Sequence, residues 1–479
     1  MSTELRNFLE IPYDRLEELN VAAKERSLSF APEEELRDYY LGYLGEEKRI
    51  KAVTICFSDL EGRFHMLDYD KKHLLHAYDN LTFDGSSIKG FSEVKESDLR
   101  LSVDWGTFRW LPSDIFGPGK VVVFGLIKTP EGKIHTADFR GRLKDYTARL
   151  RAELGLIANI SVECEGFLFQ GVCAEQNFNS REGFRLPSSG GYFNSLPRDP
   201  LKVFIDAIAE AQRALGFQNE KDHPEVAPSQ FELNYRYCDA LHAADQVQLY
   251  KLVARQVAAN MGMTASFLPK PIAAINGSGM HCNLSIAENG RNSFYDSSGE
   301  LRLSASAWDF IDRLLFNAVD LCLIFNSSVN AYRRLDPHFE APNQIKCSAV
   351  DRTAMVRVPL GDERSTRIEV RTVAPDANPY LAFYAMLRAG LEGPCDRAGA
   401  VARRSAEDRI LPGNIYEAID AFAGSRLIEE IMDARNRDKF VALKRASADR
   451  CPRELGNTVK TAEILFHHEV TNQFLWSRF

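Results

Sequence analysis

The segment SVECEGFLF at residues 161–169 constrains the fold of this chain more than any other. Its alternation of polar and apolar residues predicts a β-strand in which Glu163 and Glu165 lie on the same face. Two carboxylates on one face repel each other unless positive charge lies between them. The strand therefore either faces solvent, which is usual for an isolated Glu-x-Glu pair, or lines a cavity that binds a cation.

Further acidic residues and a histidine favour the cation-binding cavity. The segment HPEVAPSQFEL contains Glu225 and Glu232, and Pro228 predicts a bend that could turn both carboxylates to one side. His281 lies in the glycine-rich segment GSGMHCN, where a lone histidine is more often structural. Carboxylates with one imidazole suit Mg²⁺ or Mn²⁺ rather than a structural zinc. We therefore expect clustered divalent ions that bind the phosphates of a nucleotide.

Arginines accompany these acidic segments. In TRIEVRT, alternation places Arg367, Glu369 and Arg371 on one face, a pattern that also occurs in surface ladders of salt bridges. The other candidates are Arg333, Arg334, Arg352, Arg357 and Arg364. Guanidinium groups bind phosphates and carboxylates through paired hydrogen bonds. Arginines beside metal-binding carboxylates indicate phosphoryl transfer from ATP to a carboxylate, and the chain has no Walker A, GxGxxG or GxSxG sequence.

The composition excludes several classes of protein. With 479 residues, 45% apolar and 26% charged, the chain is typical of globular proteins. Its net charge of −8 lacks the basic excess that nucleic-acid binding requires. Nine cysteines without a CxxC pair are typical of a reduced, cytoplasmic protein. There is no apolar run of about 18 residues, so we expect neither a membrane nor a nucleic-acid partner.

The residue patterns predict an α+β fold. Residues 1–49 are expected to form short amphipathic helices. Residues 50–135 predict a small mixed sheet, with two strands around a turn at Glu61-Gly62 and another strand at 119–129. A larger α+β region, 136–479, is expected to begin with an amphipathic helix at 138–156. Further helices are predicted at 199–216 and 245–262.

Eight segments in the same order make the chain similar to the bacterial type I class of the glutamine synthetase family. They are FDGSSIKGF (83–91), VECEGFLF (162–169), GGYF (190–193), HPEVAPSQFE (223–232), LPKPIAAINGSGMHCNLS (268–285), RRLDPHFEAP (333–342), DRTAMVRVP (351–359) and RIEVRTVAPDANPYLAF (367–383). The resemblance implies a small N-terminal β-grasp-like domain and a larger C-terminal catalytic domain whose curved antiparallel sheet forms an active-site funnel. It also implies a dodecamer of two hexameric rings, with active sites between subunits.

The resemblance also implies which residues bind ligands. Those that match the metal ligands are Glu163, Glu165, Glu225, Glu232, His281 and Glu369. Those that match nucleotide-binding positions are His223, Asn283, Ser285, Arg357, Arg364 and Arg367. Those that match positions near glutamate and ammonium are Ser87, Tyr192, Asn276, Gly277, Arg334 and Arg371.

Three residues match catalytic positions of the family. Asp84, offered by a neighbouring subunit, would help to bind and deprotonate ammonium, and Arg352 would lie near the transferred phosphoryl group. Glu340 would lie on a flap that closes the site and would take a proton from ammonium. The implied reaction uses ATP and two or more Mg²⁺ (or Mn²⁺) ions per site. ATP phosphorylates the γ-carboxylate of glutamate, and ammonia then displaces phosphate to give glutamine.

The chain departs from the family pattern at several positions. The family usually has a second histidine two residues after the metal-binding one, where this chain has Asn283, an amide that carries no charge. In the flap, His338 and Phe339 stand where a glycine and an aromatic residue usually precede the glutamate. The tyrosine-bearing adenylylation loop is missing, and Tyr416 is expected to be packed on a helix. We therefore expect no regulation by adenylylation.

Three functions remain as alternatives at this point. Glutamate–ammonia ligation is the main expectation, because a competent residue stands at each position matched to the ammonium pocket. The altered flap leaves open a γ-glutamyl-amine ligase, which would join glutamate to a polyamine or another larger amine. A non-catalytic sensor of glutamate or nucleotide is the third alternative. It would predict loss of metal ligands or of Arg352, and the sequence retains all of them.

Overall fold

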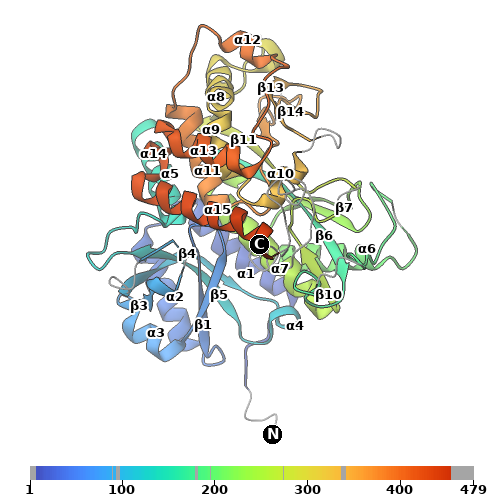
Figure 1. The fold of residues 1–479 in the computed structure, drawn as a ribbon. Helices are drawn as coiled ribbons and strands as arrows, with labels where there is room; N and C mark the ends of the chain where they lie inside the picture. Colours follow the sequence, from blue (N-terminus) through green and yellow to red (C-terminus); the bar gives the residue numbers. More distant parts are fainter. Residues whose placement is uncertain are drawn as a thin grey trace.

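The computed structural model describes most of the chain (Figure 1). The described residues are 7–88, 90–92, 98–177, 182–194, 196–272, 275–335 and 341–454. Figure 1 shows the N-terminal part of the chain, in blue, packed below the larger remainder, in green to red. None of the described helices combines the length and the apolar character needed to span a membrane. The fold is mixed α and β, as predicted.

The N-terminal part consists of helices packed on a five-stranded sheet in the order β2-β1-β5-β4-β3. The strands are β1 (Ala52–Ser58), β2 (Phe64–Asp70), β3 (Leu81–Asp84), β4 (Asp98–Trp110) and β5 (Val121–Lys128). The helices are α1 (Tyr13–Leu28), α2 (Glu33–Glu46), α3 (Lys71–Ala77) and α4 (Ser113–Phe116). The central pair β1–β5 is parallel and the other pairs are antiparallel, so the predicted mixed sheet is confirmed.

The predicted turn between the first two strands is also confirmed. Gly62 has a φ of +89°, and a Cβ there would lie 2.6 Å from the Cα of Asn378. Only glycine tolerates both this backbone angle and this close approach. The Asn378 side chain donates a hydrogen bond of 3.2 Å to the Leu60 carbonyl. The turn therefore joins the small sheet to the larger part of the molecule.

The larger part is built on a ten-stranded curled sheet. Its main path runs β13-β14-β15-β11-β6-β8-β7, with β9 and β10 paired to β6 and β12 paired to β11. The bounds are β6 (Leu156–Gln170), β7 (Asn219–Pro224), β8 (Gln230–Tyr235), β9 (Cys238–Asp239), β10 (Met263–Ser266), β11 (Met280–Glu288), β12 (Arg291–Asn292), β13 (Gln344–Ser348), β14 (Ala354–Arg357) and β15 (Ile368–Val370). The long strand β6 connects both halves of this sheet.

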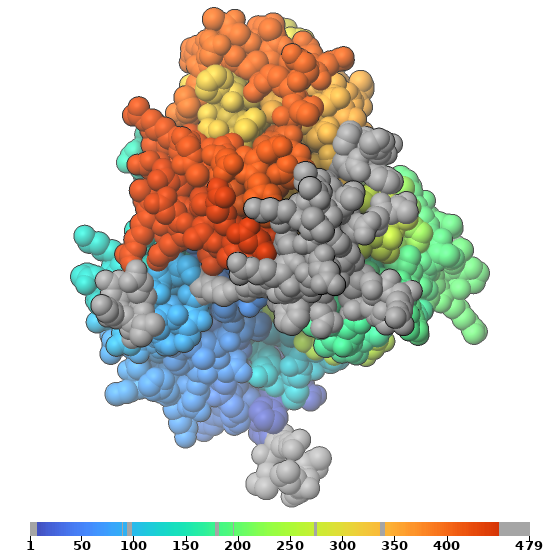
Figure 2. Space-filling view, viewed as in Figure 1, coloured from blue at the N-terminus to red at the C-terminus, as the bar shows by residue number. Residues whose placement is uncertain are grey.

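Helices cover the sheet, and the three predicted ones are confirmed. These are α5 (Phe139–Leu154), α6 (Pro200–Ala214) and α7 (Ala240–Asn260). The others are α8 (Ala305–Phe316), α9 (Ala318–Phe325), α10 (Val329–Arg334), α11 (Pro379–Glu392), α12 (Ala400–Arg404), α13 (Ile415–Gly424), α14 (Arg426–Met432) and α15 (Ala434–Glu454). In Figure 2, α13 to α15 (orange to red) form a continuous surface directly above the small domain (blue). Tyr416 lies on α13, as expected, and packs partly buried against the core.

Candidate functional site

The register between strands brings the predicted ligands together in two clusters. In the first cluster, Glu163 on β6 pairs with His281 on β11, while Glu369 on β15 pairs with Asn283 on β11. His281 Nδ1 lies 3.5 Å from a Glu163 oxygen and 3.7 Å from a Glu369 oxygen. One ligand atom from each of Glu163, His281 and Glu369 lies within 4.8 Å of the others. Such a cluster can hold a divalent metal ion.

The second cluster comes from the hairpin of β7 and β8. His223 pairs with Glu232 across the hairpin. The imidazole lies 3.6 Å from the carboxylate of Glu225 and 3.7 Å from that of Glu232. The predicted bend occurs between these strands, where Ser229 has a φ of +60°. The bend turns both carboxylates to one side, and the imidazole of His223, expected near the nucleotide, joins them.

Glu165 lies beside the second cluster. It pairs with Glu232 in the register of β6 and β8, and it accepts a hydrogen bond of 2.7 Å from the Gly279 amide. Burial, together with the charge of Glu225, raises the pKa of Glu165 to about 8. Burial and the neighbouring Glu165 raise the pKa of Glu232 well above its ordinary value. Carboxylates in such mutual repulsion fit a hard divalent cation, whose charge would compensate them.

Arginines compensate the first cluster instead. Arg357 Nε lies 2.8 Å from a Glu369 oxygen, and the Arg371 guanidinium pairs with the same carboxylate. Burial alone would raise the pKa of Glu163, but hydrogen bonds from His281 and Asn283 lower it to about 2. The carboxylate of Glu163 is therefore ionised and available to a metal ion.

Asn283 connects the first cluster to the arginine expected at the nucleotide. Its side-chain Nδ2 donates a hydrogen bond of 3.0 Å to Glu163. Its Oδ1 accepts one of 2.9 Å from Arg367 Nε. Among the described residues, this amide is therefore the bridge between Glu163 and Arg367. A neutral amide suits this position because its NH₂ group can donate to the carboxylate while its carbonyl oxygen accepts from the guanidinium.

A cavity of about 770 Å³ opens next to the first cluster. The predicted residues that line it are Glu163, Asn283, Ser285, Arg364 and Arg367. The sequence-based prediction missed Lys221, Arg236 and Tyr237, which also line the cavity. The alternation of β7 offered a weak signal for Lys221, but Arg236 and Tyr237 lie in the turn after β8, where no motif marks them. Cationic groups around this cavity suit a phosphate-bearing ligand.

Further predicted residues lie around a buried arginine. Arg334, at the end of α10, donates a hydrogen bond of 2.8 Å to the Arg371 carbonyl. Burial lowers the pKa of Arg334 to about 10, although Glu165 opposes this shift. A Cβ at Gly277 would lie 2.5 Å from the Pro269 carbonyl and 3.1 Å from Arg334 Cγ. Gly277 thus allows the loop that carries Asn276 to pass close to Arg334.

Tyr192 and Arg352 lie at the exposed side of the second cluster. The Tyr192 ring is 51% exposed and lies edge-on to His223, with 5.7 Å between ring centroids. Arg352 is exposed, and its charge acts on Glu225, lowering the pKa that burial raises. Both side chains are therefore close enough to the acidic cluster to contact a ligand bound there.

One predicted catalytic residue, Asp84, is not brought to this site within its own chain, and another, Glu340, lies outside the described residues. Asp84 ends β3 and accepts a hydrogen bond of 2.9 Å from the Ser86 amide, and Ser87 hydrogen-bonds the same carboxylate. Figure 1 shows β3 on the opposite side of the molecule from β7. Glu340, with His338 and Phe339 of the flap, lies outside the described residues.

Comparison with known proteins decides the family. The model of the glutamine synthetase catalytic domain matches residues 136–460, and that of the glutamine synthetase β-grasp domain matches residues 49–129. The chain belongs to the glutamine synthetase family. The glutamine synthetase of Methanosarcina mazei is 37% identical over 402 residues, 81% of this chain and 88% of that relative. The Clostridium saccharobutylicum glutamine synthetase is 35% identical over 85% of this chain and 94% of that relative.

Solved structures show the same fold. The Plasmodium falciparum glutamine synthetase matches with a TM-score of 0.78 at 21% identity, over 89% of this chain and 97% of that one. The ligand-free structure of GmaS matches with a TM-score of 0.72 at 29% identity, over 87% of this chain and 97% of that one. The β-grasp domain and the curled sheet expected of a glutamine synthetase are confirmed.

Proposed function

We propose that this chain uses ATP to join ammonia to the γ-carboxylate of L-glutamate, through a γ-glutamyl phosphate, giving glutamine, ADP and phosphate. The observation that carries the proposal is the arrangement of two carboxylate–imidazole clusters beside a cavity lined by cationic side chains. Phosphoryl transfer requires positioning and charge compensation more than covalent chemistry, and this arrangement supplies both.

The residues of the proposed site form two sets, one that would bind the nucleotide and one that would bind metal ions. Arg364 and Arg367 line the cavity and would bind the phosphates of ATP. Glu163, His281 and Glu369 would hold one Mg²⁺ or Mn²⁺, and Glu165, Glu225 and Glu232 another, with His223 close to the second. Bound divalent ions would supply positive charge to the phosphoryl group during transfer. Arg352 and Arg357 would add charge from the protein.

Glutamate would bind near the buried arginine. Arg334 and Arg371 would face its carboxylates, and Gly277 would allow the loop with Asn276 to approach it closely. Ammonium would bind beside Tyr192 and Glu225, where carboxylates stabilise a cation and can accept its proton. Closure of the flap that carries Glu340 would exclude water from the acyl phosphate.

The ammonium site would be completed by a second subunit. Asp84 ends β3, an edge strand of the small sheet, and Ser87 follows it closely. In Figure 1, β3 lies on the opposite side of the molecule from β7. A ring in which each small domain reaches its neighbour would supply Asp84 and Ser87, and a dodecamer of two hexameric rings is the assembly we propose. The eight cysteines whose side chains the structure describes are free, which supports the predicted cytoplasmic location.

An assay of phosphate release tests the proposal. The purified protein is given glutamate and MgATP with ammonium, or with a panel of amines that includes methylamine and a polyamine. Turnover with ammonium at low concentration supports the proposal. Turnover only with a larger amine would replace it by γ-glutamyl-amine ligation, the alternative raised by His338 in the flap. Ligand binding without any turnover would indicate the sensor.

A further inference from the structure

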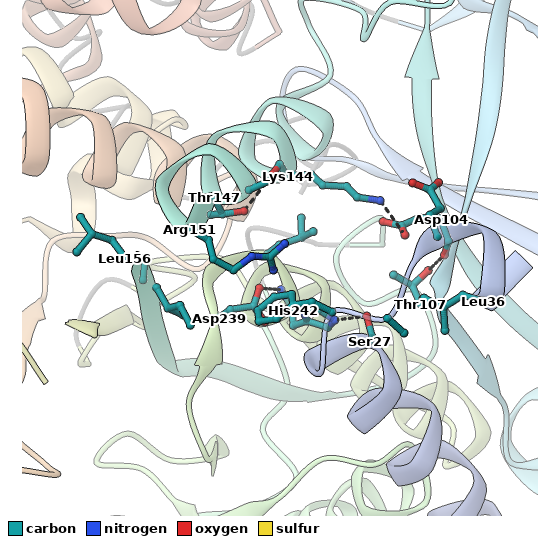
Figure 3. A pocket seen from close by; sticks show the side chains of 18 residues that line it. Ser27, Leu36, Asp104, Thr107, Lys144, Thr147, Arg151, Leu156, Asp239 and His242 are labelled. Carbon is teal, nitrogen blue, oxygen red and sulfur yellow. Dashed lines mark hydrogen bonds and ion pairs between the residues drawn. The ribbon is translucent and has the colours of Figure 1, made fainter. Parts of the chain in front are cut away.

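A second cavity lies between the two domains, away from the clusters. Its volume is about 250 Å³. Figure 3 shows it between α5, which carries Lys144 and Arg151, and the residues Leu36, Thr107 and His242 from three other elements. Its walls are mainly apolar, and residues of the N-terminal helices, the small sheet, α5, β6 and α7 all contribute. Cavities at such domain junctions are common ligand sites.

Most charged groups of this cavity are compensated within the protein. Lys144 Nζ lies 3.0 Å from Asp104, and the imidazole of His242 lies 2.6 Å from Asp239. The other ring nitrogen of His242 lies 2.8 Å from the hydroxyl of Ser27. Lys144 and Asp104 compensate each other, and Asp239 lies against the His242 imidazole as a close ion pair without hydrogen-bond geometry. These groups therefore offer no uncompensated charge to a ligand.

Arg151 is the exception. Its side chain reaches into the cavity in Figure 3. Its guanidinium lies 3.5 Å above the ring of Phe30, and no carboxylate among the described residues pairs with it. Glu33, the remaining acidic residue of the lining, is exposed at the rim, where water screens its charge. A cation that stacks on an aromatic ring beside an apolar cavity complements an anion with an apolar body.

The cavity lies directly behind the nucleotide cavity. Leu156, Ile157 and Ala158, at the start of β6, line the small cavity. Farther along the same strand, Asn159 and Glu163 line the nucleotide cavity. Because side chains of a strand alternate between its faces, Leu156 and Ala158 lie on the face of β6 opposite to Asn159 and Glu163, so this strand separates the two spaces. Ile157, near the start of the strand, shares the face of Asn159. In addition, Asn159 pairs with Asp239, which lines the small cavity.

We propose that this cavity binds a small organic anion, a carboxylate with a short apolar body, and that its occupancy changes the affinity for nucleotide through β6. The carboxylate would pair with Arg151, and the apolar body would lie against Leu36, Leu156, Ala158 and Leu241. The volume is below the range of about 300–1,000 Å³ of sites for drug-sized ligands, which limits the anion to a small one.

Binding is tested with hexanoate and with hexanamide, its uncharged isostere, by calorimetric titration of the full chain. We expect saturable binding of hexanoate and binding of hexanamide weaker by about tenfold or more, because only the carboxylate pairs with Arg151. Arg151→Gln should weaken hexanoate binding to a similar extent. The matched control is Arg149→Gln, an exposed arginine of the same helix that does not line the cavity. Equal affinities for the two probes would overturn the proposal.

A second variant tests the place of binding without removing charge. Ala148 lies on the exposed face of α5 and lines the cavity, so Ala148→Phe would fill it without disturbing the core. Ala152→Phe, on the same helix but outside the lining, is its control. Ala148→Phe should abolish hexanoate binding and Ala152→Phe should not. Binding that survives Ala148→Phe would place hexanoate elsewhere and overturn the proposal.

The coupling is tested by the affinity for a non-hydrolysable ATP analogue with Mg²⁺, measured with and without saturating hexanoate. We expect a change of about fivefold or more, with a reciprocal change in hexanoate affinity. An unchanged affinity would overturn the coupling through β6. This measurement rests on the proposed nucleotide site, whereas the hexanoate titration does not. Absence of nucleotide binding would therefore count against the proposed function and leave the test of the small cavity intact.

Discussion

At the scale of single residues, Asn283 departs from its family in an informative way. The usual histidine would be expected at the phosphates, but this amide bridges a metal ligand and an arginine of the nucleotide cavity. Because its donor and its acceptor are both used, the residue orients Arg367 and Glu163 together. We therefore expect Asn283 to act on nucleotide binding by positioning these two side chains.

Replacement of Asn283 by alanine tests this bridge. The change removes one hydrogen bond to a carboxylate and one from a guanidinium, and bonds to charged groups contribute about 1.5–3 kcal/mol each. We expect Asn283→Ala to raise the KM for ATP by about tenfold or more. Asn283→His, which keeps a donor and an acceptor, should change it far less. The measurement is steady-state kinetics at varied MgATP, with thermal unfolding to verify the fold. An unchanged KM in the alanine variant would contradict the bridging role.

At the scale of elements, three antiparallel strands place like charges in register. Glu165 on β6 pairs with Glu232 on β8, and Glu232 pairs with His223 on β7. The apolar side chains on the other face of these strands lie in the core, so the strands cannot shift to separate the carboxylates. The repulsion is therefore built into the sheet, and it is relieved by protons or by metal ions.

Metal binding should consequently depend on pH. Burial raises the pKa of Glu165 to about 8 in the metal-free protein. At neutral pH the metal ion must displace that proton, so raising the pH should tighten Mg²⁺ binding by up to about tenfold per pH unit for each proton displaced. Calorimetric titration in two buffers of different ionisation enthalpy measures the released protons. The variant Glu165→Gln should release fewer protons when it binds Mg²⁺. An affinity for Mg²⁺ that does not change with pH would contradict the prediction.

The raised pKa of Glu165 also makes the stability of the metal-free protein depend on pH. Because the pKa of Glu165 rises from 4.5 in the unfolded chain to about 8, its contribution to stability is complete below pH 4.5 and is lost as the pH rises towards 8. The metal-free protein should therefore lose stability across this interval, and added Mg²⁺ should restore it. Denaturant unfolding at several pH values, with and without Mg²⁺, measures both effects. Identical curves with and without Mg²⁺ would argue against a metal at this cluster.

At the scale of the whole molecule, a buried ion network joins the two domains. Arg140 on α5 is 1% exposed and lies 2.9 Å from Asp104 on β4 and 2.7 Å from Asp245 on α7. Lys144 reaches Asp104 as well. Three elements from both domains thus meet at one guanidinium. The predicted domain limits at residues 50 and 135 stay predictions, and this network lies close to the second of them.

Removal of that guanidinium should destabilise the fold. Arg140→Met leaves the carboxylate of Asp245 buried without its guanidinium partner and leaves Asp104 with Lys144 alone. Breaking a buried ion pair in this way typically costs about 3–5 kcal/mol. We expect a corresponding decrease in the free energy of unfolding, measured by denaturant titration. Arg149→Met is the matched control, because its side chain is 51% exposed. A decrease no larger than that of the control would contradict the role of the network.

The network also predicts a loss of stability in acid. Burial opposes ionisation of Asp104, but Lys144 and Arg140 hold its pKa below the ordinary value of 3.8. The depressed pKa contributes stability above pH 3.8, which is lost as the pH falls further. Unfolding curves recorded across this interval should show the loss in the wild-type protein, and it should be smaller in Arg140→Met. Equal acid dependence in both proteins would contradict the assignment.

Assembly is the remaining question at this scale. If Asp84 serves a neighbouring subunit, the variants Asp84→Ala and Glu165→Ala should each be nearly inactive. Co-expressed with different tags, they should form mixed rings in which about a quarter of the sites combine an intact Asp84 with an intact Glu165. Partial recovery of phosphate release in the mixed species is the expected outcome. No recovery in a verified mixed ring would show that the site does not form between subunits.

The sequence by itself determined the chemistry of this protein and much of its local structure. The spacing of Glu163 and Glu165, the bend near Pro228 and the helical periodicity of residues 138–156 depend on neighbours along the chain. Such local patterns survive in the fold because backbone geometry dictates them. The family motifs identified the same segments that the sheet later brought together.

The tertiary structure alone decided which distant residues meet. It placed His281 against Glu163 and Glu369, made Asn283 a bridge to Arg367, and set Arg151 over a cavity behind β6. No local pattern encodes these contacts, because the register between strands far apart in sequence results from the packing of the whole core. The separation of Asp84 from the clusters is likewise a property of how the two domains are joined.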